Sequence, residues 1–244
     1  MIQGIYTASR GMTALTQKQD QIANNLANIN TTGYKQSGLF TRAYQKLVKN
    51  DENQAFANQE IKSDGVYVDH SEGTMRQTKS PLDLCIKGSG FFKVMTAEGV
   101  RYTRNGNLSL NPEGLLVTSD GSKLMGTEGY IRVDKNTPIR VTDSGEVLQG
   151  GESKGAIKVV DFAKPYEMRR SGESRFAPLD PEAMELKSAG YVLKQGFLET
   201  SNVDVIRNMV SMISAYRNFE ADQKALHAQD ETLQKAVNQV GRIN

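Results

Sequence analysis

Apolar residues recur at alternating spacings of three and four near both ends of this chain of 244 residues. Such spacing is typical of a helix that lays an apolar seam against another helix. In the N-terminal seam only one residue is polar, and Gly33 follows where a helix stop is expected. This seam consists of Ile5, Ala8, Met12, Leu15, Gln19, Ile22, Leu26 and Ile29.

A second and longer seam occupies the C-terminal end. No glycine or proline interrupts residues 197–240. The pattern predicts a helix over 203–240, about 57 Å long at about 1.5 Å per residue. Ser201 and Asn202 are candidate N-caps, and Asp204 suits the first turn. The seam consists of Val205, Met209, Met212, Tyr216, Phe219, Gln223, Leu226, Asp230, Leu233, Val237 and Val240.

The middle of the chain alternates apolar and polar residues with a period of two. Glycines punctuate it at regular intervals, and the pairs Asn105-Gly106 and Asp120-Gly121 are typical turn formers. This pattern predicts antiparallel strands, with further strands over 157–162 and 191–193. The alternating apolar residues include Leu82, Leu84, Ile86, Val100, Tyr102, Leu108, Leu110, Ile131, Val133, Ile139 and Val141.

Together these patterns predict an α+β fold, with N- and C-terminal helices forming a coiled-coil region and an antiparallel all-β middle domain. The helical region is predicted to comprise residues 1–33 with 200–244, and the β-rich domain residues 81–199. Residues 34–80 are mostly polar and show little periodicity. We expect an extended linker there, with a short strand at 66–68.

Charge and composition exclude several classes of protein. The formal net charge is +2, and no basic cluster extends beyond Arg169-Arg170, so no nucleic-acid partner is predicted. Cys85 is the only cysteine, which rules out an intrachain disulfide. No apolar run reaches the length of a membrane span. The N-terminal residues lack the pattern of a secretory signal peptide, so we expect neither membrane insertion nor a cleaved signal.

No catalytic, cofactor-binding or metal site emerges from the sequence. His70 and His227 are far apart, and neither has a cysteine or a second histidine at metal-ligand spacing. Gly88-Ser89-Gly90 lacks the flanking residues of a phosphate loop or a nucleophile elbow, so we interpret it as a tight turn before a strand. We therefore predict a protein that is not an enzyme and binds no cofactor.

The unequal lengths of the two seams suggest self-assembly. Pairing the helices within one subunit would leave part of the longer seam uncovered, and other copies would have to cover it. A head-to-tail contact that does not close gives a tube or a filament. The predicted assembly contacts along the seams are Ile22, Leu26, Ile29, Met209, Met212, Tyr216, Phe219, Leu226 and Leu233.

Several amides stand beside the end of the first seam. Asn24, Asn25 and Asn28 point away from it, with the small Ala27 nearby. Small residues allow a second helix to approach closely, and amides both donate and accept hydrogen bonds. This face either contacts adjacent subunits or is a fraying helix end whose asparagines face water, and the residues alone leave both interpretations open.

Three motifs resemble the flagellar rod and hook proteins, in the order in which that family carries them. The N-terminal signature of the family is similar to GIYTASRGMTALTQKQDQIANNLANINTTGYKQ, and its C-terminal signature to LETSNVDVIRNMVSMISAYRNFEADQKAL. The family's β-domain is similar to PLDLCIKGSGFFKV and YTRNGNLSLNPEGLLVTSDG. The resemblance implies assembly contacts at Asn24, Asn25, Leu26, Ala27, Asn28, Gly33, Ser201, Asn202, Val203, Met209, Ile213 and Phe219.

The resemblance also implies a function. A subunit of this kind would belong to the drive shaft of the flagellar basal body, an inner tube of terminal helices that transmits torque across the periplasm. It would be exported through the flagellar type III apparatus and would assemble with itself and with proximal- and distal-rod subunits. The motifs GIYTA, SPLDL, YTRNGN and GAIKVVDF look most like the proximal-rod (F-type) subunit, and the alternatives are a distal-rod (G-type) or hook-type subunit.

Two more distant alternatives remain. A periplasmic cell-wall hydrolase would need a carboxylate pair or a histidine cluster, and no such pattern is recognisable. A β-module carried on a helical stalk would form a small closed oligomer instead of an open assembly.

Overall fold

The computed structural model describes residues 2–47, 57–135, 137–172, 174–180, 182–188 and 190–240. It divides into two compact units, which are described separately. The first, here called the helical unit, contains the described residues of Met1–Ala27, Ser37–Tyr67 and Asp204–Asn244. The second, here called the β-domain, contains those of Asn28–Gln36 and Val68–Val203. The predicted α+β fold is confirmed: terminal helices pack together, and the middle of the chain is antiparallel β-structure.

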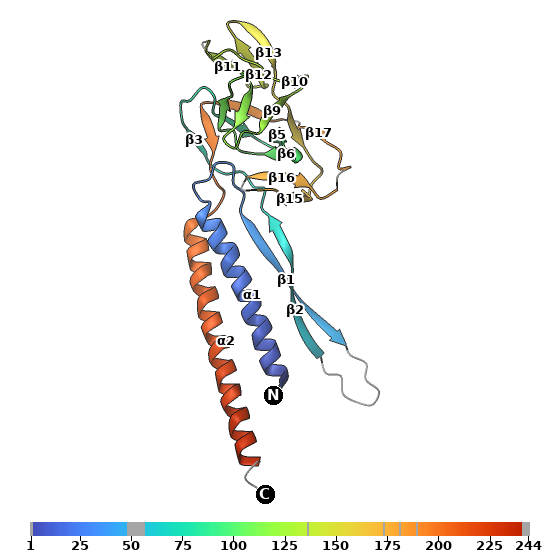
Figure 1. Cartoon of the computed structure of the whole chain (residues 1–244), viewed down its shortest axis with the longest axis vertical. Coiled ribbons are helices and arrows are strands. Elements are labelled where there is room, and N and C mark those ends of the chain that lie inside the picture. Colours follow the sequence, from blue (N-terminus) through green and yellow to red (C-terminus); the bar gives the residue numbers. More distant parts are fainter. Residues whose placement is uncertain are drawn as a thin grey trace. The chain divides into compact units, whose positions relative to one another are not determined.

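The helical unit is built on α1 (Ile2–Ala27) and α2 (Val205–Val240), which lie side by side and run in opposite directions (Figure 1). Glycines in α1 allow the close approach. A Cβ added to Gly4 would come within 2.8 Å of the Gln229 side chain, and one added to Gly11 within 3.2 Å of Asp222. Seven residues forward in α1 thus correspond to seven residues backward in α2, which defines an antiparallel pair with a heptad period.

The helix ends differ from those predicted. α1 ends at Ala27, so Ile29 lies in the following turn and not in the helix. α2 begins at Val205, and its N-cap is Asp204, whose Oδ1 accepts a hydrogen bond from the Arg207 amide at 3.0 Å. An N-cap carboxylate satisfies an amide that has no partner within the helix, so Ser201 and Asn202 lie ahead of the cap.

Strands β1 (Ser37–Leu47) and β2 (Ala57–Val68) pair in a two-stranded sheet within residues 34–80, where the sequence predicted an extended linker. The predicted strand at 66–68 is the last part of β2. At the start of the pair, the Tyr67 ring fills the space beside Gly38, where an added Cβ would lie 2.5 Å from the ring. The sequence hides this pair because its residues are largely polar and do not alternate.

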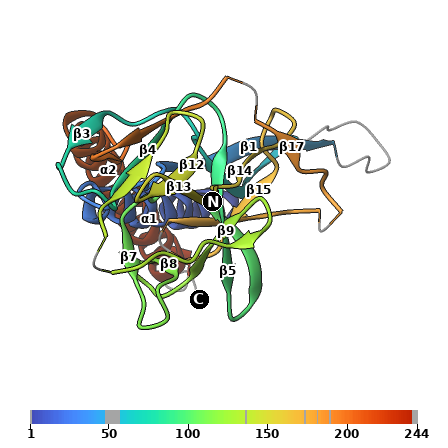
Figure 2. The same cartoon turned by 90° about the horizontal axis from the view of Figure 1, so that it is seen from above.

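The β-domain consists of short strands, and in the described residues ten of them form its largest sheet. Figure 2 shows β7 beside β8 and β5 beside β9, in agreement with their pairing. The members of this sheet are β5 (Phe91–Thr96), β6 (Gly99–Thr103), β7 (Leu108–Leu110), β8 (Leu116–Thr118), β9 (Lys123–Gly126), β10 (Gly129–Tyr130), β14 (Val159–Asp161), β15 (Met168–Arg170), β16 (Arg175–Pro178) and β17 (Leu186–Lys187).

The remaining strands of the β-domain form smaller antiparallel sheets. They are β11 (Ile139–Val141), β12 (Glu146–Gln149) and β13 (Glu152–Ala156) in one sheet, β4 (Leu84–Lys87) with β18 (Val192–Gln195), and β3 (Met75–Gln77) with β19 (Phe197–Glu199). The predicted strands at 157–162 and 191–193 correspond to β14 and β18.

The predicted turn at Asn105-Gly106 is instead a place where two backbone segments approach each other closely. Asn105-Gly106 does not close a hairpin, because β6 pairs with β5 and β16, whereas β7 pairs with β8. A Cβ added to Gly106 would lie 1.8 Å from the Leu84 carbonyl oxygen. Glycine is needed here for the close approach of two backbone segments. The Asp120-Gly121 turn is confirmed, with Gly121 at φ +82°.

The core of the β-domain contains two apolar clusters. The larger includes most of the alternating residues that the sequence singled out, among them Leu84, Ile86, Leu108, Ile131 and Val141. Cys85 is fully buried beside them. The smaller cluster is aromatic, and its members are Phe91, Tyr102, Val160, Phe162, Met168 and Phe176.

His70 lies against this aromatic cluster. Its ring meets those of Phe91, Tyr166 and Phe176 edge-on, with centroids 5.0–5.6 Å apart. Both ring nitrogens are buried and have no hydrogen-bond partner among the described residues. Burial, together with the positive charges of Lys35, Arg104 and Arg170, lowers the pKa of His70 to about 4, against the opposing effect of Asp69.

We predict that His70 makes the β-domain sensitive to acid. Since its pKa is lower in the folded than in the unfolded chain, the unfolded chain binds the extra proton as the pH falls below about 6.5, and stability declines until about pH 4. The total loss should approach about 3 kcal/mol. Urea unfolding measured from pH 7 to pH 4 checks this, with His70→Leu as the comparison. A slope that is the same in both proteins would contradict the prediction.

Candidate assembly surfaces

A buried carboxylate organises the β-domain at the point where the N- and C-terminal motifs meet. Glu199, at the end of β19, is 1% exposed. Its Oε1 accepts hydrogen bonds from the Lys35 ammonium at 2.5 Å and from the Gly73 amide at 3.0 Å. Its Oε2 accepts one from Arg104 at 3.4 Å. We call Lys35, Arg104 and Glu199 the buried triad.

The buried triad joins segments that are far apart in the sequence. The Gly33 amide donates to the Glu199 carbonyl at 2.9 Å, and Gly33 has φ +68°, which favours glycine. A Cβ there would lie 2.4 Å from the Asn105 amide nitrogen. The triad therefore binds together the three motifs that carry the family resemblance.

Asn202 reinforces this junction. Its side-chain oxygen accepts a hydrogen bond from the Gln36 amide at 2.7 Å, and its side-chain nitrogen donates to the Asp69 carbonyl at 2.9 Å and to Ser71. Val203 beside it is buried. Within the β-domain, these contacts fix the chain where it leaves toward residues 37 and 204.

The pairing of opposite charges offsets part of the desolvation cost of burying the triad. Burial lowers the pKa of Lys35 below its ordinary value, although the Glu199 carboxylate raises it. The Arg104 guanidinium also donates to the carbonyls of Ile86 and Gly88. Removing the carboxylate would leave two buried cations without their counter-charge.

Asn25 shows what one of the conspicuous amides does within the helical unit. It is 2% exposed, and its amide both donates to the Ser37 carbonyl at 2.8 Å and accepts from the Ser37 amide at 3.0 Å. Asn24 is exposed and donates to the Asp20 carbonyl, and in the β-domain Asn28 accepts a hydrogen bond from Thr31. Asn25 therefore ties the end of α1 to the start of β1, an interpretation that differs from both alternatives left open by the sequence.

The face of α2 that packs on α1 is only partly the predicted seam. Met212, Phe219, Leu226 and Leu233 are partly buried and lie on the same heptad stripe as Asp222 and Gln229, which contact α1. The alternate positions of this stripe are the buried Asn208 and Ala215, not the predicted Met209 and Tyr216. A small or polar residue at these positions allows the two helices to pack closely. The spacing of apolar residues in the sequence does not reveal such positions.

Met209 and Tyr216 belong instead to a second apolar face of α2. Met209 and Tyr216 are 48% and 56% exposed. Ile213 is 54% exposed. Together with Ile206 and Val210 they lie at spacings of three and four along the first turns of the helix, and we call these five residues the outer stripe. Contiguous exposed apolar residues on one helix face mark an interaction site.

The other predicted assembly residues range from buried to exposed. Ile22 is buried, Leu26, Ile29 and Ser201 are partly buried, and Ala27 is exposed. Gly33 is buried in the β-domain junction. The sequence patterns missed Lys35, Arg104 and Glu199. A charged residue is expected to be exposed to solvent, and the sequence gives no sign that these three are buried together.

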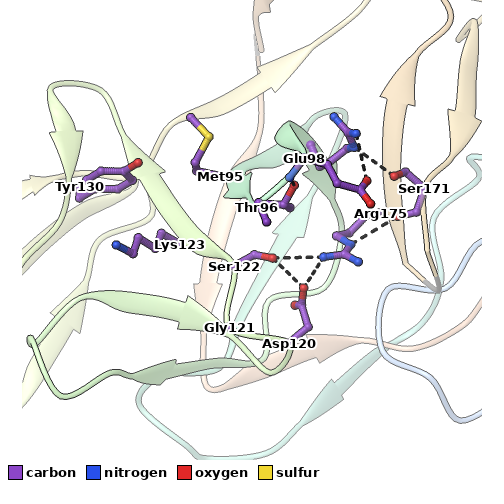
Figure 3. A pocket seen from close by; sticks show the side chains of 12 residues that line it. Met95, Thr96, Glu98, Asp120, Gly121, Ser122, Lys123, Tyr130, Ser171 and Arg175 are labelled. Atoms are coloured by element: carbon purple, nitrogen blue, oxygen red, sulfur yellow. Dashed lines mark hydrogen bonds and ion pairs between the residues drawn. The ribbon is translucent and has the colours of Figure 1, made fainter.

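A notch of about 520 Å³ on the β-domain is lined by several charged residues, and Figure 3 shows its lining. Both of its arginines are paired within the notch. Arg175 pairs with Asp120 and bonds Ser122, while Arg101 bonds Ser171 and pairs with Glu98. Although burial alone would raise it, hydrogen bonds from Ser122 and Thr118 and the Arg175 charge hold the pKa of Asp120 below its usual value.

Two kinds of functional feature are absent from the residues that the structure covers. Over these residues, no group of three or more His, Cys, Asp or Glu side chains could hold a metal ion. Neither helix, along its described length, is long and apolar enough to cross a membrane.

Comparison with known proteins agrees with this architecture. The chain matches the family "Flagella basal body rod protein" over residues 5–35, "Flagellar hook protein FlgE/F/G D1 domain" over 85–149 and "Flagellar basal body rod FlgEFG protein C-terminal" over 194–240.

Curated relatives are similar along their whole length. The flagellar hook-basal body complex protein FlhO of Bacillus subtilis is 31% identical, with 100% of both chains covered. The flagellar basal-body rod protein FlgF of Caulobacter vibrioides is 33% identical over 97% of this chain and 96% of its own. FlgG of Bacillus subtilis is 30% identical over 98% and 99%.

A pair of packed terminal helices, an antiparallel β-domain and an apolar stripe that stays exposed on α2 are the features of a structural axial subunit. The chain belongs to the flagellar basal-body rod and hook family FlgE/F/G. It is a structural subunit of the flagellar rod and is not an enzyme, and membership in the rod family implies assembly with other axial proteins.

We predict that Glu199→Gln destabilises the β-domain by about 3–5 kcal/mol, because Lys35 and Arg104 would stay buried without a counter-charge. Urea unfolding followed by far-ultraviolet circular dichroism measures this. Glu98→Gln is the control: Glu98 is an exposed partner of Arg101, and its loss should cost less than about 1 kcal/mol. Equal effects of the two substitutions would contradict the assigned role of the triad.

We also predict that the two faces of α2 respond differently to a charge. Phe219→Asp should loosen the α1–α2 pair and lower the stability of the helical unit by about 2 kcal/mol. Ile213→Asp, on the outer stripe, should leave stability unchanged and prevent incorporation into the rod. Thermal unfolding and immunoblots of isolated basal bodies provide the readouts. Normal incorporation of the Ile213 variant would contradict the role of the outer stripe.

Proposed function

We propose that the chain is a proximal-rod (F-type) subunit that self-assembles through its terminal helices into a helical tube and transmits torque across the periplasm. The observation that carries this proposal is the outer stripe, an apolar face of α2 that remains exposed after α1 has packed on the opposite face. Other copies and neighbouring axial subunits would cover it. Torque would then pass through packed helix interfaces, which require stiffness and no chemistry.

Alignment lengths support the F-type over its relatives. The alignment with FlgF of Caulobacter vibrioides spans 238 positions and 97% of this chain, so it opens almost no gap in this chain. The alignment with FlgG of Bacillus subtilis spans 264 positions, more than the 244 residues present here. That relative therefore carries residues that this chain lacks. The distal-rod (G-type) or hook-type subunit is the alternative, because identities to FlgF and FlgG differ by only a few per cent.

The proposed assembly contacts follow the structure. The outer-stripe residues Met209, Ile213 and Tyr216 would contact other subunits directly. The exposed Asn24 and Ala27 would contribute from α1. Buried residues of the predicted set would act indirectly, since they hold the helices and the β-domain junction in the form that assembles.

We propose the remaining features on the basis of the resemblance. The chain would be exported by the flagellar type III apparatus without a cleaved signal peptide and would assemble in the periplasm. Its neighbours would be the other proximal-rod proteins on one side and the distal rod on the other.

Placement of the chain in isolated basal bodies tests the proposal. A short peptide tag inserted after Gly121, a turn with nothing within 4 Å of an added Cβ, should label the membrane-proximal part of the rod in electron micrographs. Label along the distal rod would favour the G-type alternative. Label absent from rods of motile cells that express the tagged chain would overturn the proposed function.

A further inference from the structure

An apolar groove of about 480 Å³ lies on the β-domain, away from the notch of Figure 3. Phe162, Pro165, Met168, Pro178, Met184 and Leu186 line it. Two large apolar side chains that line the groove are exposed to solvent: Met184 is 78% exposed and Leu186 is 42% exposed. Leu179, in the same loop, is 61% exposed. An apolar hollow with exposed apolar edges is typical of a surface that a partner covers.

The charges around this groove are predominantly acidic. Glu167 and Asp180 belong to its lining, and Glu182 is exposed in the adjoining loop. The one cation among the described lining residues is Lys164, whose ammonium donates to Ser89 Oγ at 3.2 Å and lies over the Tyr166 ring. An apolar partner group with basic neighbours would suit such a groove.

The same β-domain carries a group of that chemistry at β10. Tyr130 is 48% exposed, and the Lys123 ammonium lies 5.6 Å from its ring centroid. Arg132 and Lys135 are exposed nearby, against the acidic Glu128 and Asp134. Tyrosine with adjacent cations is a common anchor of protein interfaces.

One copy cannot place its own Tyr130 in its own groove. Tyr130 lies opposite Met125 of β9, the Met125 carbonyl accepts a bond from the Lys158 amide just before β14, and Leu186 of β17 lies opposite Asp161 of β14. Strands β9 and β14 therefore stand between the tyrosine and the groove. A tyrosine side chain does not span that separation, so the fitting groove belongs to a second molecule.

We propose that Tyr130 of one copy of this chain inserts into the groove of Phe162, Met184 and Leu186 on the next copy, so that β-domains join head to tail. Lys123 accompanies Tyr130 and pairs with Glu167 at the edge of the groove. This contact joins two different surfaces, and a contact of that kind is compatible with an open helical assembly. It rests on the proposed function as an axial subunit and adds a β-domain contact to that of the helices.

Cysteine cross-linking of the full chain tests the contact. In a Cys85→Ala background, Tyr130→Cys and Met184→Cys are prepared as separate proteins, and both sites are exposed, so folding should be preserved. Under mild oxidation a disulfide dimer should form in the mixture and not in either protein alone, because a disulfide requires Cβ atoms about 4 Å apart. The pair Ser144→Cys with Met184→Cys is the matched control, since Ser144 is exposed elsewhere on the β-domain.

Charge exchange gives a second readout. Lys123→Glu in the Tyr130→Cys protein should lower the cross-linked fraction by about threefold, and Glu167→Lys in the Met184→Cys protein should restore it. Cross-linking no greater than in the Ser144 control, or Met184→Cys dimers that form without the Tyr130→Cys protein, would overturn the contact.

The outcomes also separate this inference from the proposed function. A chain that enters the rod but shows no cross-link between positions 130 and 184 overturns the β-domain contact alone. A cross-link in purified protein from a chain that is absent from the rod supports the contact and overturns the rod assignment.

Discussion

The buried carboxylate of Glu199 is the interaction on which the rest of the β-domain junction depends. It pairs with Lys35 and Arg104 and accepts a hydrogen bond from the Gly73 amide, so three other segments of the chain converge on its two oxygen atoms. A hydrophobic residue could fill the space but could not select these partners. The ion pairs fix which segments meet, at a desolvation cost that only the complete set of partners offsets.

In the helical unit, α2 presents two different faces that carry apolar residues. One face of α2 carries Asn208, Ala215 and Phe219 and packs on α1 through glycines that permit close approach. The outer stripe, around Ile213, has no cover in the described residues of this copy. α2 therefore has apolar residues on two faces, one packed on α1 and the other exposed.

Periodicity in the sequence predicted the element types well and the packing faces only in part. Alternation from Leu84 to Val141 identified the β-core, and heptad spacing identified both helices. The same spacing placed Met209 and Tyr216 in the apolar seam of α2, whereas the face that packs on α1 carries the buried Asn208 and Ala215 instead. The spacing of apolar residues does not show that a small or polar side chain packs closer to the neighbouring helix. The β1–β2 pair lacked alternation, and the triad lacked any local signal, since Lys35 and Glu199 are meaningful only once the fold brings them together.

The separation of those two residues has a consequence for the kinetics of folding. Lys35 and Glu199 are 164 positions apart, so the junction cannot close until most of the polypeptide is available. Contacts of such long range slow the search for the native state. Closing this junction therefore takes longer than closing one between segments that are neighbours in the sequence.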